Sequence, residues 1–196
     1  MASFFQSGRY TGVVRADGEE RRLEGRLGFR DRGWGLRKHE GPARRGMHVF
    51  CACELPDEAL YLLLYETASG ERAFTRGWLV DERGVVDTVR GAEHDLRLEG
   101  RRLLGGRIGV ELGSGAAREL RFETEGRMWM EAVGYTAVPG RAAPGAERLD
   151  LADPAVRDAW DGMYDNACRF SCDGVGGHGF VEVGLGVHAR YLPEAA

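Results

Sequence analysis

Hydrophobic and polar residues alternate with a period of two along most of the chain, which is typical of half-buried β-strands. The first such segment is 9–16, and Asp17-Gly18 after it is a dipeptide favoured in two-residue hairpin turns. The return strand is expected at 20–30. Further strands are expected at 47–55, 60–67, 72–81, 85–90, 95–99, 103–112, 118–138 and about 180–191. The segment 118–138 is either two strands divided at Gly126 or one long bent strand. The turns between them are short, so the pattern predicts a meander of about nine or ten antiparallel strands.

One segment has helical spacing instead. Asp153 suits the N-cap position and Pro154 the first position of a helix. Apolar residues from Leu151 to Met163 then recur at helical intervals. We therefore expect one helix near the C-terminus, at about 153–166.

These elements favour one all-β domain over residues 1–196. A meander with tight turns can close into a β-barrel, which removes the exposed sheet edges. A two-sheet sandwich is the alternative. Gly accounts for 30 of the 196 residues and is spread along the chain, as turns, bulges and barrel corners require. A barrel of this size can enclose one small apolar ligand.

The charge balance and hydropathy exclude several partners. The chain has 27 Lys and Arg against 31 Asp and Glu, a net charge of -4. Nucleic acid is therefore not expected as a partner, because phosphate binding requires a basic surface. No apolar run approaches the roughly 20 residues of a membrane span. The first residues show no signal-peptide pattern, so a cytoplasmic location is expected.

The cysteines and histidines do not have the spacing of metal ligands. Cys51 and Cys53 are two residues apart and Cys168 and Cys172 four apart, whereas zinc sites favour CxxC pairs. We expect all four thiols to be reduced and buried as small apolar side chains. The histidines form no HxH or HxxxH pair, and the phosphate-loop, dinucleotide and nucleophile-elbow motifs are absent. Neither a metal nor a cofactor is expected.

The segment 28–37, GFRDRGWGLR, concentrates charge, glycine and one tryptophan. Asp31 lies between Arg30 and Arg32 along the chain. Its carboxylate either forms ion pairs that fix a change in chain direction, or is a buried acid whose pKa is set by burial and by its neighbours. Trp34 either lines a ligand cavity or closes the end of the barrel.

The segment 174–187, GVGGHGFVEVGLGV, has two different faces in extended conformation. His178, Phe180 and Glu182 share one face, and the aliphatic residues on the other face are expected to be buried. If the polar face points into a barrel, His178 and Glu182 are an acid–base pair about 13 Å apart along the strand. If it points to solvent, they are ordinary surface residues.

Two patterns resemble those of the hydroxyneurosporene-synthase-like proteins, which include the carotenoid 1,2-hydratases. A G-x-RD-x-x-WG-x-R signature is formed by Gly28, Arg30, Asp31, Trp34, Gly35 and Arg37. A weaker G-x-G-x-x-E element is similar at Gly177, Gly179 and Glu182, with His178 where the family often has an aromatic residue. The resemblance covers roughly residues 9–137 and 175–191. It corresponds to the C-terminal one of the family's two barrel-type domains.

The resemblance implies a lipocalin-like, calycin-type barrel with an apolar cavity. It also implies cofactor-free hydratase or cyclase chemistry, a lyase or isomerase reaction, on an isoprenoid- or polyketide-like substrate. Protonating a double bond requires a poorly solvated acid in a shielded pocket. Asp31 matches the signature and is the expected general acid, with Glu182 and His178 as a second acid–base pair. The expected substrate-binding residues are Arg30, Trp34, Arg37, His48, Phe50, Trp78 and Trp129.

Two other hypotheses compete with the enzyme. The first is a lipocalin-like carrier of a hydrophobic ligand, for which Asp31→Asn should leave ligand uptake intact. The second is a structural domain whose barrel is filled by large side chains. The side chains expected inside such a barrel are Phe50, Tyr61, Phe122 and Trp129. Because the family has two domains, this one either forms a homodimer to rebuild a site between domains or uses its own interior.

Overall fold

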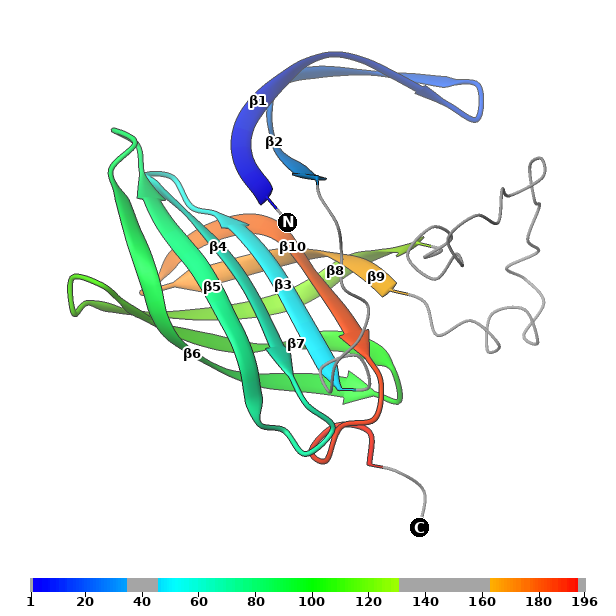
Figure 1. The fold of residues 1–196 in the computed structure, drawn as a ribbon. Coiled ribbons are helices and arrows are strands. Elements are labelled where there is room, and N and C mark those ends of the chain that lie inside the picture. The colour runs from blue at the N-terminus through cyan, green and yellow to red at the C-terminus, as the bar shows by residue number, and fades with distance from the viewer. Residues whose placement is uncertain (1, 35–45, 131–162, 194–196) are drawn as a thin grey trace.

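The computed structural model describes residues 2–34, 46–130 and 163–193, and these residues form ten β-strands (Figure 1). The strands are β1 (Ala2–Ala16), β2 (Glu19–Trp34), β3 (Met47–Glu54), β4 (Glu58–Glu66), β5 (Arg72–Asp81), β6 (Val86–Glu99), β7 (Arg102–Leu112), β8 (Ala117–Met130), β9 (Met163–Cys172) and β10 (Val175–Leu185). Every pairing between them is antiparallel.

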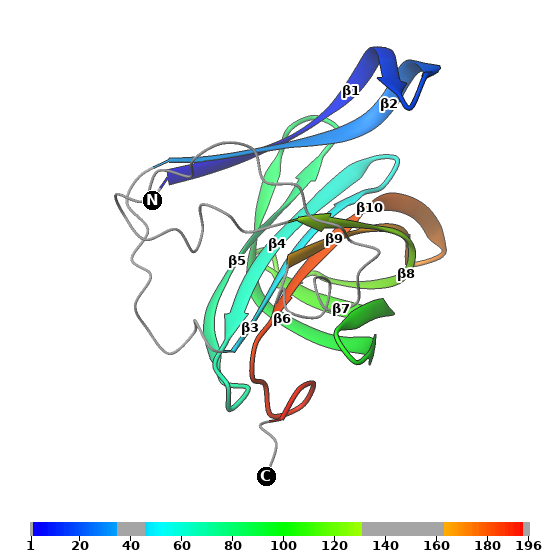
Figure 2. The same ribbon diagram turned by 90° about the vertical axis from the view of Figure 1, so that its right-hand side faces the viewer.

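Eight of the strands close into a barrel in the order β10-β3-β4-β5-β6-β7-β8-β9. Each strand pairs with its neighbours along the chain, and β10 closes the ring by pairing with β3. Strands β1 and β2 form a separate hairpin that arches over one outer face of the barrel (Figures 1 and 2). The all-β barrel expected from the alternation is confirmed, and the sandwich alternative is wrong.

The helix expected at 153–166 is wrong where the structure describes it. Residues 153–162 lie outside the described part of the chain, and Met163–Asn166 are the first residues of strand β9. Asn166, Cys168, Phe170 and Cys172 are buried, and the residues between them are more exposed, so the alternation of a strand decides the conformation here. The described residues contain no helix.

Several strand boundaries also differ: β1 begins at Ala2 rather than at residue 9, and β2 ends at Trp34 rather than at residue 30. The segments expected at 85–90 and 95–99 are parts of one long strand, β6. The last strand begins earlier and ends at Leu185 rather than near 191. The residues after it form only an isolated bridge between His188 and Leu192. Residues 131–138, expected to continue β8, lie outside the described part of the chain.

The inward-facing side chains of the eight barrel strands pack into one apolar core. It includes Val49, Leu62, Ile108, Phe170 and Val181, each at most 1% exposed. The four cysteines are free thiols within this core, as expected. Of the large side chains expected inside a filled barrel, Phe122 lies in this core, whereas Phe50 and Tyr61 lie on the outer face. The side chain of Trp129 lies outside the described part of the structure.

Aromatic side chains attach the β1–β2 hairpin to the barrel. Phe5 and Phe29 project from the hairpin, and their ring centroids lie 5.1–6.2 Å from those of barrel aromatics. Their barrel partners are Phe50, Tyr61, Trp78 and Phe180. Asp17 and Gly18 both have positive φ, as the predicted tight turn requires. Because an isolated two-stranded hairpin is only marginally stable, these ring contacts fix its position.

A buried polar cluster lies where the chain leaves β10. The Glu66 carboxylate accepts hydrogen bonds from Arg72 and from Nε2 of His188, at 2.8 and 3.0 Å. Nε2 of His94 lies 3.0 Å from the same carboxylate. His94 in turn contacts the Tyr191 hydroxyl at 3.0 Å. This cluster, Glu66–Arg72–His94–His188–Tyr191, ties the C-terminal segment to strands β4 and β6.

Candidate active site on the outer face

The outward-facing residues of β8, β9, β10, β3 and β4 form rows that run across the strands. One row, read from the pairing registers, is Met128, Asp165, Glu182, Phe50 and Leu63. The next is Gly126, Ala167, Phe180, Ala52 and Tyr61. A third contains Arg169, His178, Glu54 and Ala59. Adjacent strands are about 4.8 Å apart, so side chains within a row are immediate neighbours.

A cavity of about 610 Å³ lies over these rows, beside the attachment point of the hairpin. Its lining residues are Gly28, Phe29, Ala52, Glu54, Gly126, Arg127, Met128, Asp165, Ala167, His178, Gly179 and Phe180. Glycine and alanine form much of the floor, and Phe29 and Phe180 contribute aromatic walls. This cavity is therefore on the outside of the barrel, and not in the interior where a ligand was expected.

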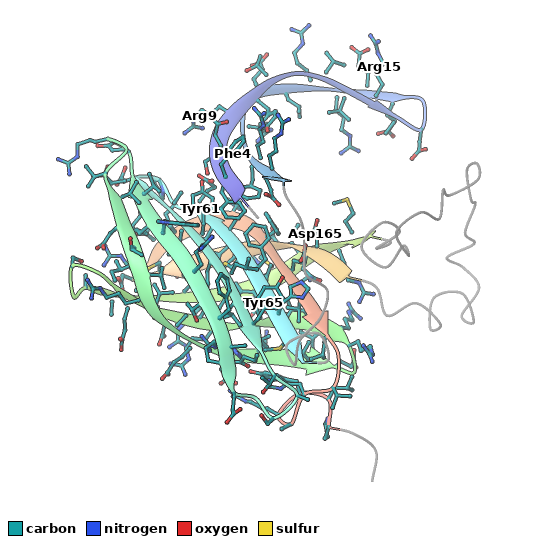
Figure 3. The ribbon with its side chains drawn as sticks, in the orientation of Figure 1. Phe4, Arg9, Arg15, Tyr61, Tyr65 and Asp165 are labelled. Carbon is teal, nitrogen blue, oxygen red and sulfur yellow. The ribbon has the colours of Figure 1, made fainter. Side chains whose placement is uncertain are left out.

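Asp165, Glu182 and His48 form a chain of polar groups across β9, β10 and β3. Asp165 and Glu182 are directly opposite in register and share a side-chain hydrogen bond. Nε2 of His48 lies 2.7 Å from Oε1 of Glu182. The His48 and Glu182 side chains are 17% and 15% exposed, so this pair is largely withdrawn from water. Figure 3 shows Asp165 at the start of β9, below the hairpin.

The pKa of Asp165 is raised into the range in which a carboxyl group can act as a proton donor. Burial, then the charge of Glu182, then the hydrogen bond to Glu182 raise the pKa of Asp165 to about 6. Its Oδ1 is buried without a hydrogen-bond partner among the described residues. A carboxyl group with a pKa near 6 still has a protonated fraction close to neutral pH, and this form can donate its proton to a bound molecule.

Two neighbours position His48. Its imidazole lies over Gly184, where an added Cβ would be 2.1 Å from the ring. The ring of Tyr65 lies 5.3 Å away on the next strand. The absence of a side chain at Gly184 therefore lets His48 lie flat against β10 and reach Glu182.

The raised pKa of Asp165 predicts that the stability of the protein depends on pH. The folded state binds this proton more tightly than the unfolded chain, whose Asp pKa is near 3.8. Relative to Asp165→Asn, the wild type should therefore lose stability as pH rises from about 4 to 6, by roughly 1–2 kcal/mol because the carboxyl is partly solvated. Urea denaturation of both proteins at pH 4 and pH 7 measures this difference. If the free energies of unfolding of the two proteins differ by the same amount at pH 4 and at pH 7, the pKa of Asp165 is not raised.

The residues expected from the sequence fall into separate groups. The structure brings Glu182 and His48 into contact, and it places His178 in the cavity lining near Glu54. His178 and Glu182 share the outward face of β10, as expected, but each has a different partner. Phe50 and Trp78 belong to the aromatic cluster under the hairpin.

In the described part of the signature segment, Gly28 and Phe29 line the cavity and residues 30–33 do not. Asp31 is exposed on β2 and does not line the cavity, although it is two residues from Phe29, which does. The Arg30 guanidinium lies 5.2 Å from the centroid of the Phe4 ring. Arg37 and the side chains of Trp34 and Trp129 lie outside the described part of the structure. A role for these residues in catalysis or binding stays a prediction.

Sequence reasoning missed Asp165 and Glu54. Asp165 was placed in the expected helix, where it has no relation to Glu182. The signal that could have found it is the alternation that begins at Asn166, which puts Asp165 on the face opposite the buried residues. Glu54 ends an apolar strand and its sequence neighbourhood gives no indication of a cavity.

The described ranges contain no group of three or more His, Cys, Asp or Glu side chains arranged to hold a metal ion. They also contain no helix that could cross a membrane. The ionisable side chains that line the cavity are those of Glu54, Arg127, Asp165 and His178.

Two solved structures share the fold. A protein assigned as AttH from Nitrosomonas europaea has a TM-score of 0.60 and 15% identity, over 94% of this chain and 52% of that one. Kievitone hydratase from Nectria haematococca has a TM-score of 0.58 and 12% identity, over 93% of this chain and 53% of that one. The chain thus spans about half the length of each. No protein-family model matches the sequence, and no curated protein matches it.

Proposed function

We propose that this protein is a cofactor-free hydratase or cyclase that protonates a double bond of an apolar, isoprenoid- or polyketide-like substrate, with Asp165 as the proton donor. The observation that carries the proposal is a partly buried acid with a pKa of about 6 in the wall of an apolar cavity. A carrier needs no such group, because burying a carboxyl costs stability and adds nothing to the binding of an apolar ligand. The hydratase with the same fold supports the same class of chemistry.

In the proposed reaction the Asp165 carboxyl gives its proton to one carbon of the double bond. The neighbouring carbon becomes a cation, which the faces of Phe29 and Phe180 stabilise. In a hydration, water adds to this cation and returns one proton to the Asp165–Glu182 pair. In a cyclisation, a second double bond of the substrate attacks the cation, and the new cation then loses a proton to the Asp165–Glu182 pair. Both routes restore the carboxyl pair without a cofactor.

Glu182 and His48 position the acid. Glu182 accepts the hydrogen bond of protonated Asp165, and His48 holds Glu182 in place through Nε2. Asp31, the acid expected from the signature, lies on the hairpin that covers part of this face and is the alternative donor.

The test is an incubation with apolar polyenes and terpenoids in D₂O, followed by mass spectrometry of the free and the protein-retained fractions. A product with new deuterium on carbon supports proton transfer to a double bond. A ligand that is retained unchanged would show that the protein is a carrier, and the enzyme proposal would be wrong.

A further inference from the structure

The cavity has a second polar end, which the proposed reaction does not use. Glu54 lines the cavity from β3, opposite His178 in register. Asp165 lies two strands away and four residues along β10, a separation of about 16 Å for flat strands. Between the two ends lie Ala52, Ala167 and Phe180. The cavity is therefore apolar in the middle and polar at both ends.

Glu54 has an oxygen that is available to a ligand. The Tyr61 hydroxyl donates to Oε1 of Glu54 at 3.3 Å and also contacts Oγ of Ser7 on the hairpin. Among the described residues, Oε2 of Glu54 accepts no hydrogen bond. Burial raises the pKa of this carboxyl, and the charge of Arg9 opposes that shift. Tyr61 and Ser7 fix the carboxyl under the hairpin with one oxygen unused (Figure 3 labels Tyr61 and Arg9).

The surroundings select a neutral hydrogen-bond donor. The opposite charges of Glu54 and Arg9 act against each other on a charged ligand group of either sign, so neither a cation nor an anion gains much here. A hydroxyl group can donate to Oε2 of Glu54, and the imidazole of His178 across the strand offers a second hydrogen bond. An apolar chain attached to this hydroxyl would lie along Ala52, Ala167 and Phe180 and extend toward Asp165.

We propose that Glu54, held by Tyr61, binds a hydroxyl group of the substrate, and that the substrate is an apolar unsaturated chain with this hydroxyl about 16 Å from the reacting bond. The inference rests on the proposed function for the position of the reacting bond. The hydroxyl site itself can be tested by binding alone, so it can fail or succeed independently of turnover.

The probes are isoprenoid alcohols of 10, 15 and 20 carbons and their methyl ethers, which keep the chain and the oxygen but lose the O–H donor. Affinities are measured by titration calorimetry. We expect the wild type to bind at least one alcohol about tenfold or more tightly than its ether, as a hydrogen bond to a carboxylate would give. Equal affinities at every chain length would overturn the proposal.

The variants locate the hydroxyl. Glu54→Leu should bind the alcohol and its ether with about equal affinity, and its affinity for the ether should stay within a few-fold of that of the wild type. Glu54→Gln keeps an acceptor oxygen and should retain part of the preference. Asp165→Asn should retain all of it, because Asp165 lies at the other end of the cavity. Full preference in Glu54→Leu, or its loss in Asp165→Asn, would show that the hydroxyl binds elsewhere.

If no deuterium is incorporated from D₂O but the alcohol preference depends on Glu54, the proposed reaction fails and the hydroxyl site stands. If deuterium is incorporated and the preference is absent, the reaction stands and the hydroxyl site is wrong. The two proposals are therefore separable.

Discussion

Asp165→Asn is expected to lower turnover by about 10²–10⁴-fold, the usual effect of removing a general acid. The amide keeps the shape of the side chain but has no transferable acidic proton. Turnover of the wild type should also fall as pH rises through about 6, because the protonated form of Asp165 is the reactive one. Initial rates of deuterium incorporation, measured on a substrate found in the D₂O panel, check both expectations.

Two variants serve as controls for this result. Asp173→Asn lies in the exposed β9–β10 turn, where positive φ also suits Asn, and should keep full activity. Asp31→Asn separates the two candidate acids. If Asp31→Asn loses activity and Asp165→Asn retains it, the signature residue is the proton donor and the assignment to Asp165 is wrong.

Glu66→Gln is expected to lower the free energy of unfolding by about 3 kcal/mol. The Glu66 side chain is 7% exposed and pairs with Arg72, His94 and His188. Replacing its charge leaves the Arg72 guanidinium without its ion-pair partner and weakens two hydrogen bonds from imidazoles. Urea denaturation followed by circular dichroism measures the change.

The matched control is Glu123→Gln, which removes a charge from the exposed Arg97–Glu123 pair on strands β6 and β8. Its expected effect is below about 0.5 kcal/mol, because both side chains are well solvated. If Glu66→Gln and Glu123→Gln lower the free energy of unfolding by similar amounts, the buried cluster contributes no more to stability than an exposed ion pair.

Acid should weaken the same cluster in the wild type. Burial works against ionised Glu66, but the charge of His94 and the hydrogen bonds of Arg72 and His94 outweigh it and lower its pKa. Burial also lowers the pKa of His94, against the opposing effect of Glu66. Both groups bind protons more weakly in the folded state, so their contribution to stability is lost as pH falls.

The barrel could be predicted from local information because apolar and polar residues alternate along most of its strands and its turns are short. Asp17-Gly18 marks a hairpin, and Val181, Val183 and Leu185 mark a buried face, without knowledge of any distant residue. The helix error has a local cause as well. Asp153-Pro154 is a strong helix start, and the helical spacing after it overlaps the first residues of β9.

The candidate site could not be predicted in the same way, since it depends on contacts between distant parts of the chain. His48 and Glu182 are 134 residues apart and meet only because β10 closes the ring against β3. The alternation in β10 identifies two faces but does not say that the polar face lies outside the barrel under a hairpin. That information comes from the packing of Phe5 and Phe29 on the barrel aromatics.

The alternation of buried and outward-facing residues along β9, β10 and β3 has an evolutionary consequence. Residues that determine stability and residues that line the cavity alternate along the same strands, with their side chains on opposite faces. Mutations at Ala52, Ala167 or Phe180 can therefore reshape the cavity while Cys51, Cys168 and Val181 keep the core intact. Such a barrel can change the ligand that its outer cavity accepts, by drift or by directed evolution, with little loss of folding stability.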